Sequence, residues 1–279
     1  MSTGTNDTTT QADKAARFLE LHGGEAPLLM PNPWDVGSAK LLASLGFNAL
    51  ATTSSGFAAT LGRLDGGVSR DEALAHAAAI VEATDVPVSA DLENCYADDP
   101  AGVAETIRGA VATGLAGCSV EDFTRDSDDP VYELAAATER VAAAAEVAHS
   151  GPVHFVLTAR AENFIRGRRN LADTIARLQA YQGAGADVLF APGVSDLDEI
   201  RQLVAAVDLP VNVLAMPGGP SVAELGSVGV KRISVGGAFA YAAFGAAVEA
   251  ARELQEQGTY GYWSLASSGA TAVRAAFAR

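Results

Sequence analysis

The feature that most constrains the fold is a unit that recurs along the chain. An alanine-rich helical stretch ends at a glycine, and a short apolar strand follows. Glycine suits the left-handed position just past a helix, and a continuously apolar strand is expected where both faces of a parallel sheet are covered. The unit therefore predicts helix–strand crossovers onto a parallel sheet. Four copies are Gly46-Phe47-Asn48-Ala49-Leu50, Gly114-Leu115-Ala116-Gly117, Gly185-Ala186-Asp187-Val188 and Gly229-Val230-Lys231-Arg232.

Extending this pattern along the chain predicts eight strands, over 27–31, 48–53, 86–91, 116–121, 153–159, 187–191, 210–214 and 231–235. Helical patterns separate them, and a serine before an acidic turn, as at Ser69, is typical of a helix start. Strand alternating with helix eight times predicts a (β/α)8 TIM barrel. The alternative is an open, doubly wound sheet. That fold would place a glycine-rich turn after the first strand, where Pro31-Asn32-Pro33-Trp34 stands instead.

The ends of the chain carry helical patterns beyond the eight repeats. One covers 11–22, and two more lie in 239–279, divided near 258–261. Extra helices at both ends suggest contacts between subunits. No linker rich in Pro, Gly or Ser divides the chain, so residues 11–279 are predicted to form one barrel domain. The polar, Thr-rich residues 1–10 are predicted to be disordered.

Charge and cysteine usage exclude several classes of function. The formal net charge of -15 leaves no basic footprint for nucleic acid. No apolar run reaches the length of a membrane span, and the amino terminus lacks the pattern of a signal peptide. The two cysteines, Cys95 and Cys118, form neither a zinc motif nor a disulfide framework. A cytoplasmic location is therefore expected.

Acidic side chains gather where the predicted strands end, which is where barrel enzymes place their chemistry. Asp91 and Glu93 follow the third strand, Glu121 and Asp122 the fourth, and Arg160 the fifth. None of the four histidines and three lysines falls at this edge. A zinc site, a histidine acid/base pair and a Schiff-base lysine are therefore not expected here. A set of oxygen ligands favours Mg2+, with Mn2+ as the alternative. The alternative to a metal site is that these carboxylates are helix caps and solvated charges at the barrel rim.

Several of these segments, taken in order, resemble the isocitrate lyase/phosphoenolpyruvate mutase superfamily over residues 15–245, with the mutase-like bacterial branch as the nearest group. Each segment alone is weakly specific, but the ordered set is strong. The segments are Asn32-Pro33-Trp34-Asp35, Thr53-Ser54-Ser55-Gly56, Ala90-Asp91-Leu92-Glu93, Val120-Glu121-Asp122, Thr158-Ala159-Arg160 and Ala184-Gly185-Ala186-Asp187.

The resemblance implies roles for individual residues. Metal ligands would be Asp91, Glu93 and Glu121, although the family more often has Asp where Glu93 stands. Catalytic residues would be Arg160, Asp65 and Glu121, with Arg160 gripping the substrate carboxylate. The resemblance also implies a homo-oligomer, a dimer or tetramer, in which the carboxyl-terminal helix is swapped between subunits. Candidate substrate-binding residues are Trp34, which otherwise packs against the barrel rim, Ser54, Ser55, Gly56, Phe57, Arg160 and Asn212.

Departures from the family narrow the expected reaction. The true lyases carry a general-acid cysteine in the loop after the fourth strand, but residues 123–130 here contain no Cys, Lys or His. The mutases carry a histidine after the sixth strand, where Pro192 stands. Cys95 is predicted to be an apolar filler. We therefore expect a Mg2+-dependent lyase or decarboxylase that cleaves a C–C bond of a small 2-oxo or 2-hydroxy (di)carboxylate through an enolate. The alternatives are a P–C bond hydrolase or mutase on a phosphonopyruvate-like substrate, and a non-catalytic carboxylate-binding barrel.

Overall fold

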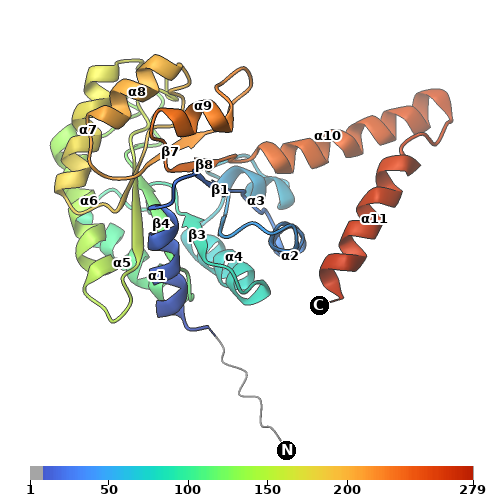
Figure 1. Cartoon of the computed structure of the whole chain (residues 1–279), viewed down its shortest axis with the longest axis horizontal. Helices are drawn as coiled ribbons and strands as arrows, with labels where there is room; N and C mark the ends of the chain where they lie inside the picture. The colour runs from blue at the N-terminus through green and yellow to red at the C-terminus, as the bar shows by residue number, and fades with distance from the viewer. Residues whose placement is uncertain (1–8, 279) are drawn as a thin grey trace, which may run out of the picture.

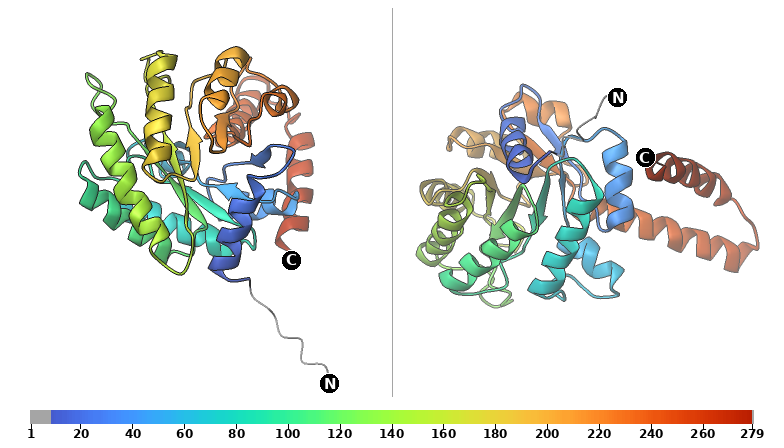
Figure 2. Two further views of the ribbon diagram at one scale, coloured as in Figure 1. Left: turned by 60° about the vertical axis from the view of Figure 1, so that its left-hand side comes forward. Right: turned by 90° about the horizontal axis from the view of Figure 1, so that it is seen from below.

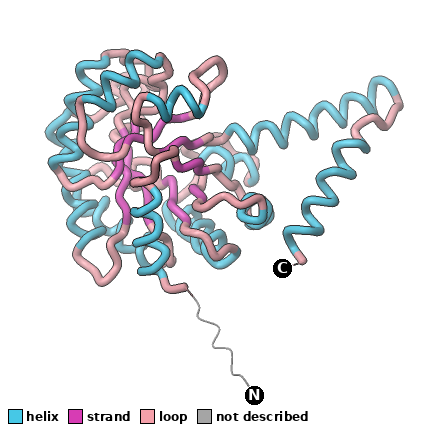
Figure 3. The backbone as a smooth tube through the Cα atoms, viewed as in Figure 1, coloured by secondary structure: helices cyan, strands magenta, loops and turns pink. Residues whose placement is uncertain are grey.

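Eight parallel strands form the centre of the molecule and helices surround them, as the computed structural model shows for residues 9–278 (Figures 1 and 3). The prediction of disorder over residues 1–10 concerns mainly residues 1–8, which lie outside the described residues. The strands are β1 (Leu28–Met30), β2 (Leu50–Ala51), β3 (Val88–Asp91), β4 (Gly117–Glu121), β5 (Val156–Arg160), β6 (Val188–Phe190), β7 (Val211–Leu214) and β8 (Arg232–Ser234).

All eight predicted strands are present, and they pair in the order β1-β8-β7-β6-β5-β4-β3-β2. Every pair is parallel, with registers such as Glu121 beside Arg160. Between β1 and β2 the backbone N–H of Ala51 donates to the Pro31 carbonyl at 3.1 Å, which brings the two ends of the sheet together. The prediction of a (β/α)8 barrel over an open doubly wound sheet is confirmed.

The helices begin where the sequence supplies side-chain caps. Ser69 accepts from the backbone N–H of Glu72, and the Glu72 carboxylate accepts from the Ser69 N–H, which is the capping box that the sequence predicts. The helices are α1 (Gln11–Leu21), α2 (Val36–Ser44), α3 (Ser54–Thr60), α4 (Arg70–Ala83), α5 (Pro100–Ala112), α6 (Leu134–His149), α7 (Leu171–Gly183), α8 (Leu197–Ala205), α9 (Val222–Ser227), α10 (Ala238–Arg252), the π-helix η1 (Glu253–Gln257) and α11 (Trp263–Phe277).

Helix α1 covers the amino-terminal end of the barrel. Its buried residues Ala15 and Phe18 pack in one cluster with the first residues of several strands, such as Leu28, Val156 and Val188. The main core lies between the strands and helices α2 to α9 and is built largely from Ala, Val and Leu. With one end of the barrel closed by a helix, the other end is left for binding.

Helices α10 and α11 form an arm that projects from the barrel, and α11 folds back toward α2 (Figures 1 and 2). The two predicted carboxyl-terminal helices and their break are confirmed. Much of the arm is apolar and exposed, including Tyr241, Phe244, Leu254, Trp263 and Leu265. No helix among the described residues is both long and apolar enough to cross a membrane.

Candidate active site

A cavity of about 250 Å3 opens at the carboxyl ends of the strands. Side chains from β1 to β8 and from the loops that follow them line it, so it occupies the position that the topology predicts for chemistry. Pro192 and apolar side chains form part of its lining, and the polar part consists of Asn32, Thr52, Thr53, Ser54, Ser55, Asp65, Ser89, Asp91, Ser119, Arg160, Asn212, Arg232 and Ser234.

Arg160, the last residue of β5, lines this cavity and is the centre of an ion-pair network whose other members, apart from Asp91, are absent from the cavity lining. Its Nη1 lies 2.8 Å from Asp91 Oδ1, and its Nη2 lies 2.9 Å from Glu121 Oε2 and 2.8 Å from Glu162 Oε1. A second cation, Arg166, lies 3.1 Å from Glu162 Oε2. The cluster of Asp91, Glu121, Glu162, Arg160 and Arg166 therefore contains three carboxylates and two guanidinium groups. The sequence predicts the proximity of Arg160, Asp91 and Glu121, but it does not single out Glu162 or Arg166.

Burial determines the protonation properties of these acids. Glu121 is 5% exposed, and its burial raises the pKa of its carboxyl well above the usual value, despite the Arg160 guanidinium. Asp91 is more accessible, and its Oδ2 accepts from the backbone N–H and the hydroxyl of Ser54, at 3.3 Å and 3.1 Å. When all its acids are ionised, the cluster has one negative charge in excess, and a bound cation would lower the free-energy cost of burying that charge.

The carboxylate of Glu93, the third predicted metal ligand, is engaged by groups outside the Arg160 network. Its carboxylate accepts from Arg125 Nη2 at 2.7 Å and from the Tyr96 hydroxyl at 3.2 Å. The backbone is left-handed at Glu93, Cys95, Tyr96 and Arg125, with φ values of 51°, 60°, 56° and 67°. Burial raises the pKa of Glu93 to about 7, and the Arg125 guanidinium offsets part of that effect. The Arg125 guanidinium is thus held by the Glu93 carboxylate.

Asp122 does not belong to the acidic cluster at the cavity. Its Oδ1 accepts from the Glu162 N–H at 2.7 Å, while Oδ2 accepts from Arg177 Nη1 at 3.0 Å and from the Tyr181 hydroxyl. Successive residues of a strand point to opposite faces, so Glu121 faces the interior when Asp122 faces helix α7. The expectation that Asp122 converges with Asp91 and Glu121 is wrong, and its role is to join β4 to α7.

The segment after β2 forms the short helix α3 beside the cavity. Thr53 caps it by accepting from the Gly56 N–H, and Ser54 binds Asp91 as described. The N–H of Ser55 lies in the first turn, where no intrahelical acceptor exists. A Cβ on Gly56 would lie 2.6 Å from Thr53 Cγ2 and 3.1 Å from Trp34 Cβ, so only glycine fits there without a shift.

The remaining predicted residues divide between the cavity and its surroundings. Asp65 and Asn212 line the cavity. Phe57 stacks on His76, with ring centroids 3.8 Å apart, beside a much smaller neighbouring void. Trp34 packs at the rim against α3 and is absent from the cavity lining. Cys95 is fully buried, and burial raises the pKa of its thiol to about 12, which agrees with an apolar filler.

Arg232 of β8 is a cavity residue that the sequence analysis missed. Its Nε donates to Asn212 Oδ1 at 3.0 Å, and its Nη1 donates to Thr158 Oγ1 at 3.1 Å. Among the described residues no carboxylate pairs with it, and burial lowers the pKa of Arg232 to about 9, with Arg160 adding repulsion. The spacing of Arg232 and Ser234, two polar residues at positions i and i+2 of an apolar strand, was the available signal.

Comparison with known proteins agrees with this architecture. The family described as phosphoenolpyruvate phosphomutase matches residues 18–255. An uncharacterized protein of Mycobacterium tuberculosis is 33% identical over 240 residues, which span 86% of this chain and 89% of that protein. A solved structure from Burkholderia cenocepacia, provisionally described as a lyase/mutase, is 51% identical, with a TM-score of 0.88 over 90% of this chain and 91% of that one.

A second similar structure is that of a named enzyme with a bound product. Oxaloacetate acetylhydrolase in complex with its product oxalate has a TM-score of 0.81 and 26% identity, over 92% of this chain and 90% of that one. The resemblance inferred from the sequence motifs is therefore confirmed. The chain belongs to the phosphoenolpyruvate phosphomutase family, within the isocitrate lyase/phosphoenolpyruvate mutase superfamily of lyases and mutases that act on small carboxylates.

Proposed function

We propose that the chain is a Mg2+-dependent lyase or decarboxylase, with Mn2+ as an alternative ion, that cleaves a C–C bond of a small 2-oxo or 2-hydroxy (di)carboxylate. The observation that carries this proposal is the cluster around Arg160 in a cavity of about 250 Å3. That volume lies below the range of about 300–1,000 Å3 typical of drug-sized ligands, so it suits a small acid. The cavity lining contains no His, Lys or Cys, so it offers no thiolate, no Schiff-base amine and no histidine base to activate its serines.

The donor set of this cavity fits a hard divalent cation. Asp91, which lines the cavity, and Glu121, which is absent from its lining, both pair with the Arg160 guanidinium, and their cluster has one more acidic than basic group. We infer that these two residues hold Mg2+, and that Glu93 acts on them only indirectly because Arg125 and Tyr96 occupy its carboxylate. When bound, the cation supplies Lewis-acid stabilisation for the negative charge that develops on the substrate.

The protein's own groups account for the rest of the proposed chemistry. A substrate carboxylate binds the Arg160 fork, whose planar donors match a carboxylate. The free N–H of Ser55 and the guanidinium of Arg160 support the enolate that forms when the bond to C3 breaks. Arg232 and Asn212, deeper in the cavity, suit a second carboxylate of the substrate because Arg232 has no acidic partner among the described residues. For oxaloacetate, loss of CO2 leaves the enolate of pyruvate, which takes a proton from water.

The test is product analysis with oxaloacetate, using the purified full chain and Mg2+. We expect pyruvate and CO2, or oxalate and acetate, to form faster than with Mg2+ alone, and the rate to fall at least a hundredfold in Asp91→Ala. Release of inorganic phosphate from phosphonopyruvate, without cleavage of oxo acids, would favour the P–C alternative. Absence of turnover together with metal-dependent oxalate binding would favour a carboxylate-binding barrel.

We further infer that the arm of α10 and α11 packs on another copy of the chain, in a dimer or tetramer. Its exposed apolar side chains would otherwise face water, and contiguous apolar surface of this kind marks interaction sites. Exchange of α11 between subunits would cover it, with the contact that α11 makes on α2 then made on a neighbour. Light scattering should show an oligomer that Trp263→Ser/Leu265→Glu dissociates; an unchanged mass for that variant would contradict the inference.

Buried, unpaired cysteines support a cytoplasmic location.

A further inference from the structure

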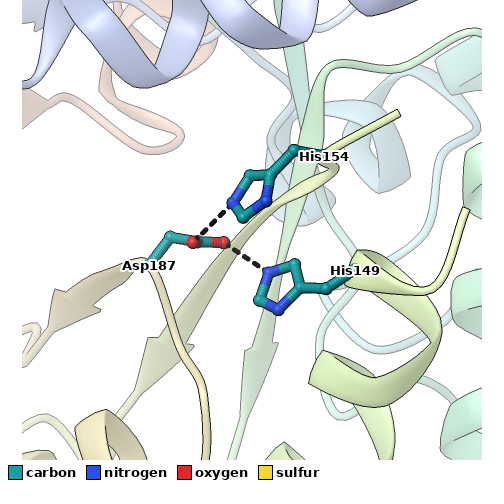
Figure 4. A group of neighbouring side chains, drawn as sticks. All are labelled: His149, His154 and Asp187. Atoms are coloured by element: carbon teal, nitrogen blue, oxygen red, sulfur yellow. Dashed lines mark hydrogen bonds and ion pairs between the residues drawn. The ribbon is translucent and has the colours of Figure 1, made fainter. Parts of the chain in front are cut away.

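A second cluster of ligand-type side chains lies at the opposite end of the barrel from the cavity. His149 is the last residue of α6, His154 lies in the loop before β5, and Asp187 immediately precedes β6. Both imidazoles point toward the single carboxylate of Asp187 (Figure 4). His149 Nε2 lies 3.0 Å from Oδ2 and His154 Nε2 lies 2.8 Å from Oδ1. The proposed reaction uses none of these residues.

The three donor atoms are close enough to converge on one ion. One ligand atom from each of His149, His154 and Asp187 lies within 4.8 Å of the other two, and no other such group of His, Cys, Asp or Glu occurs in the part of the chain that the structure describes. Zinc binds imidazole nitrogen and carboxylate oxygen at about 2.0–2.2 Å in a tetrahedral shell, which separates neighbouring ligands by roughly 3.3 Å. His149 Nε2 and His154 Nε2 face different oxygens of Asp187, at 3.0 and 2.8 Å, so when Asp187 supplies both oxygens each of these separations needs to open by only a few tenths of an ångström.

The two rings have the freedom that such a rearrangement needs. They stack with centroids 4.4 Å apart and planes within 9° of parallel, so each must turn out of the stack to aim at a common point. The His149 and His154 side chains are 28% and 47% exposed, and neither ring bonds any other described residue. Asp187 is more firmly held, because its Oδ2 also accepts from the Leu157 N–H at 2.8 Å. The arrangement thus has one fixed ligand and two adjustable ones, open to solvent.

We propose that His149, His154 and Asp187 bind a borderline transition-metal cation of the Zn2+ class, with water in the remaining coordination position. Imidazole donors favour Zn2+ over Mg2+, whereas the all-oxygen cluster at the other end of the barrel favours Mg2+. The bound ion joins the end of α6, the α6–β5 loop and the start of β6, and so braces the amino-terminal end of the barrel. The strongly negative net charge of -15 also favours cation binding.

The test is a Zn2+ titration of the full chain against a fluorescent zinc chelator at pH 7.5, with 5 mM Mg2+ present. We expect one tightly bound Zn2+ per chain. Binding should weaken at least tenfold in His154→Ala, and the site should be lost in His149→Ala/His154→Ala. The double variant Asp91→Asn/Glu121→Gln is the matched control, because it disables the proposed Mg2+ site and should retain the Zn2+.

A second measurement keeps the result independent of folding. An anomalous difference peak within about 2.3 Å of both Nε2 atoms in Zn2+-soaked crystals would identify the ligands directly. If zinc binding were equal in wild type and the histidine double variant, or lost only in Asp91→Asn/Glu121→Gln, the proposal would be overturned. The same holds if no Zn2+ binds at micromolar concentration, in which case the three residues only hydrogen-bond the α6–β5 loop.

Discussion

Replacing Glu121 with Gln should separate the stability of the metal-free protein from its response to Mg2+. Glu121 is buried beside Arg160, and burial raises the pKa of its carboxyl, so the charged form is a disfavoured state in the absence of a cation. With all its acids ionised the cluster has one negative charge in surplus, and glutamine imitates the neutral form of Glu121 while retaining the shape of the side chain. Arg160 keeps its contacts with Asp91 and Glu162. The metal-free variant should therefore be as stable as wild type or more stable by up to about 2 kcal/mol.

The response to Mg2+ should move in the opposite direction. At an Mg2+ concentration 100 times the Kd, the wild type gains about 2.7 kcal/mol. If the lost ligand charge contributes about 2 kcal/mol, affinity falls roughly thirtyfold. At the same Mg2+ concentration the variant then gains only about 0.9 kcal/mol. In a chain of this size the difference corresponds to roughly 4–7 °C in the Mg2+-induced rise in Tm.

The assay is thermal unfolding followed by circular dichroism at pH 7.5, with EDTA and with a series of Mg2+ concentrations. Glu139→Gln is the matched control, because Glu139 is an exposed residue of α6 and should leave both quantities unchanged. A loss of more than about 2 kcal/mol in the metal-free Glu121→Gln variant would refute the charge argument. A full Mg2+ response in that variant would refute the assignment of Glu121 as a ligand.

Three further predictions concern charged residues of the barrel. Arg177→Met should cost about 3–5 kcal/mol in urea unfolding because it strands the buried Asp122 carboxylate, and adding Asp122→Asn should recover part of the loss. Burial raises the pKa of Glu93 to about 7, so the contribution of this group to the stability of the metal-free protein is lost as pH rises from about 4.5 to about 7. The stability of Glu93→Gln relative to wild type should therefore increase by up to about 3 kcal/mol between pH 5 and pH 8. A stability difference that does not change with pH would contradict this. Arg232→Met should weaken competitive inhibition by four-carbon diacids at least tenfold while changing inhibition by oxalate less than twofold, and equal losses would remove Arg232 from substrate recognition.

The sequence predicts the barrel well because its dominant signals are local. A glycine after a helix, which occurs four times, and a short apolar strand after each helical stretch require only backbone preferences and two-sided burial. Strand ends are less well predicted: the second strand is shorter than expected, and the fifth begins at Val156 rather than 153. Hydrogen-bonded register decides these limits, and it depends on neighbouring strands rather than on the residues themselves.

The sequence predicts that the site lies at the carboxyl ends of the strands, but it does not predict which side chains pair with each acidic residue. Topology alone places Asp91, Glu121 and Arg160 together, since the carboxyl ends of parallel strands meet at one end of a barrel. Alternation along β4 could have separated Glu121 from Asp122, because consecutive strand residues face opposite sides. The pairing of Glu93 with Arg125 lay beyond such rules. It depends on left-handed backbone at both residues, which are 32 positions apart and in different loops.

The distribution of charge within the barrel supports a division of labour among its arginines. Arg177 neutralises an acid that points away from the cavity, and Arg125 neutralises one at its margin. Arg160 is shared by three acids, so a bound cation that takes over Asp91 and Glu121 would free its donors for a substrate carboxylate. Of the arginines that line the cavity, Arg160 and Arg232, only Arg232 has no acid to satisfy among the described residues. A buried guanidinium in that state costs free energy unless an anion reaches it, and a dicarboxylate bound between Arg160 and Arg232 would satisfy both.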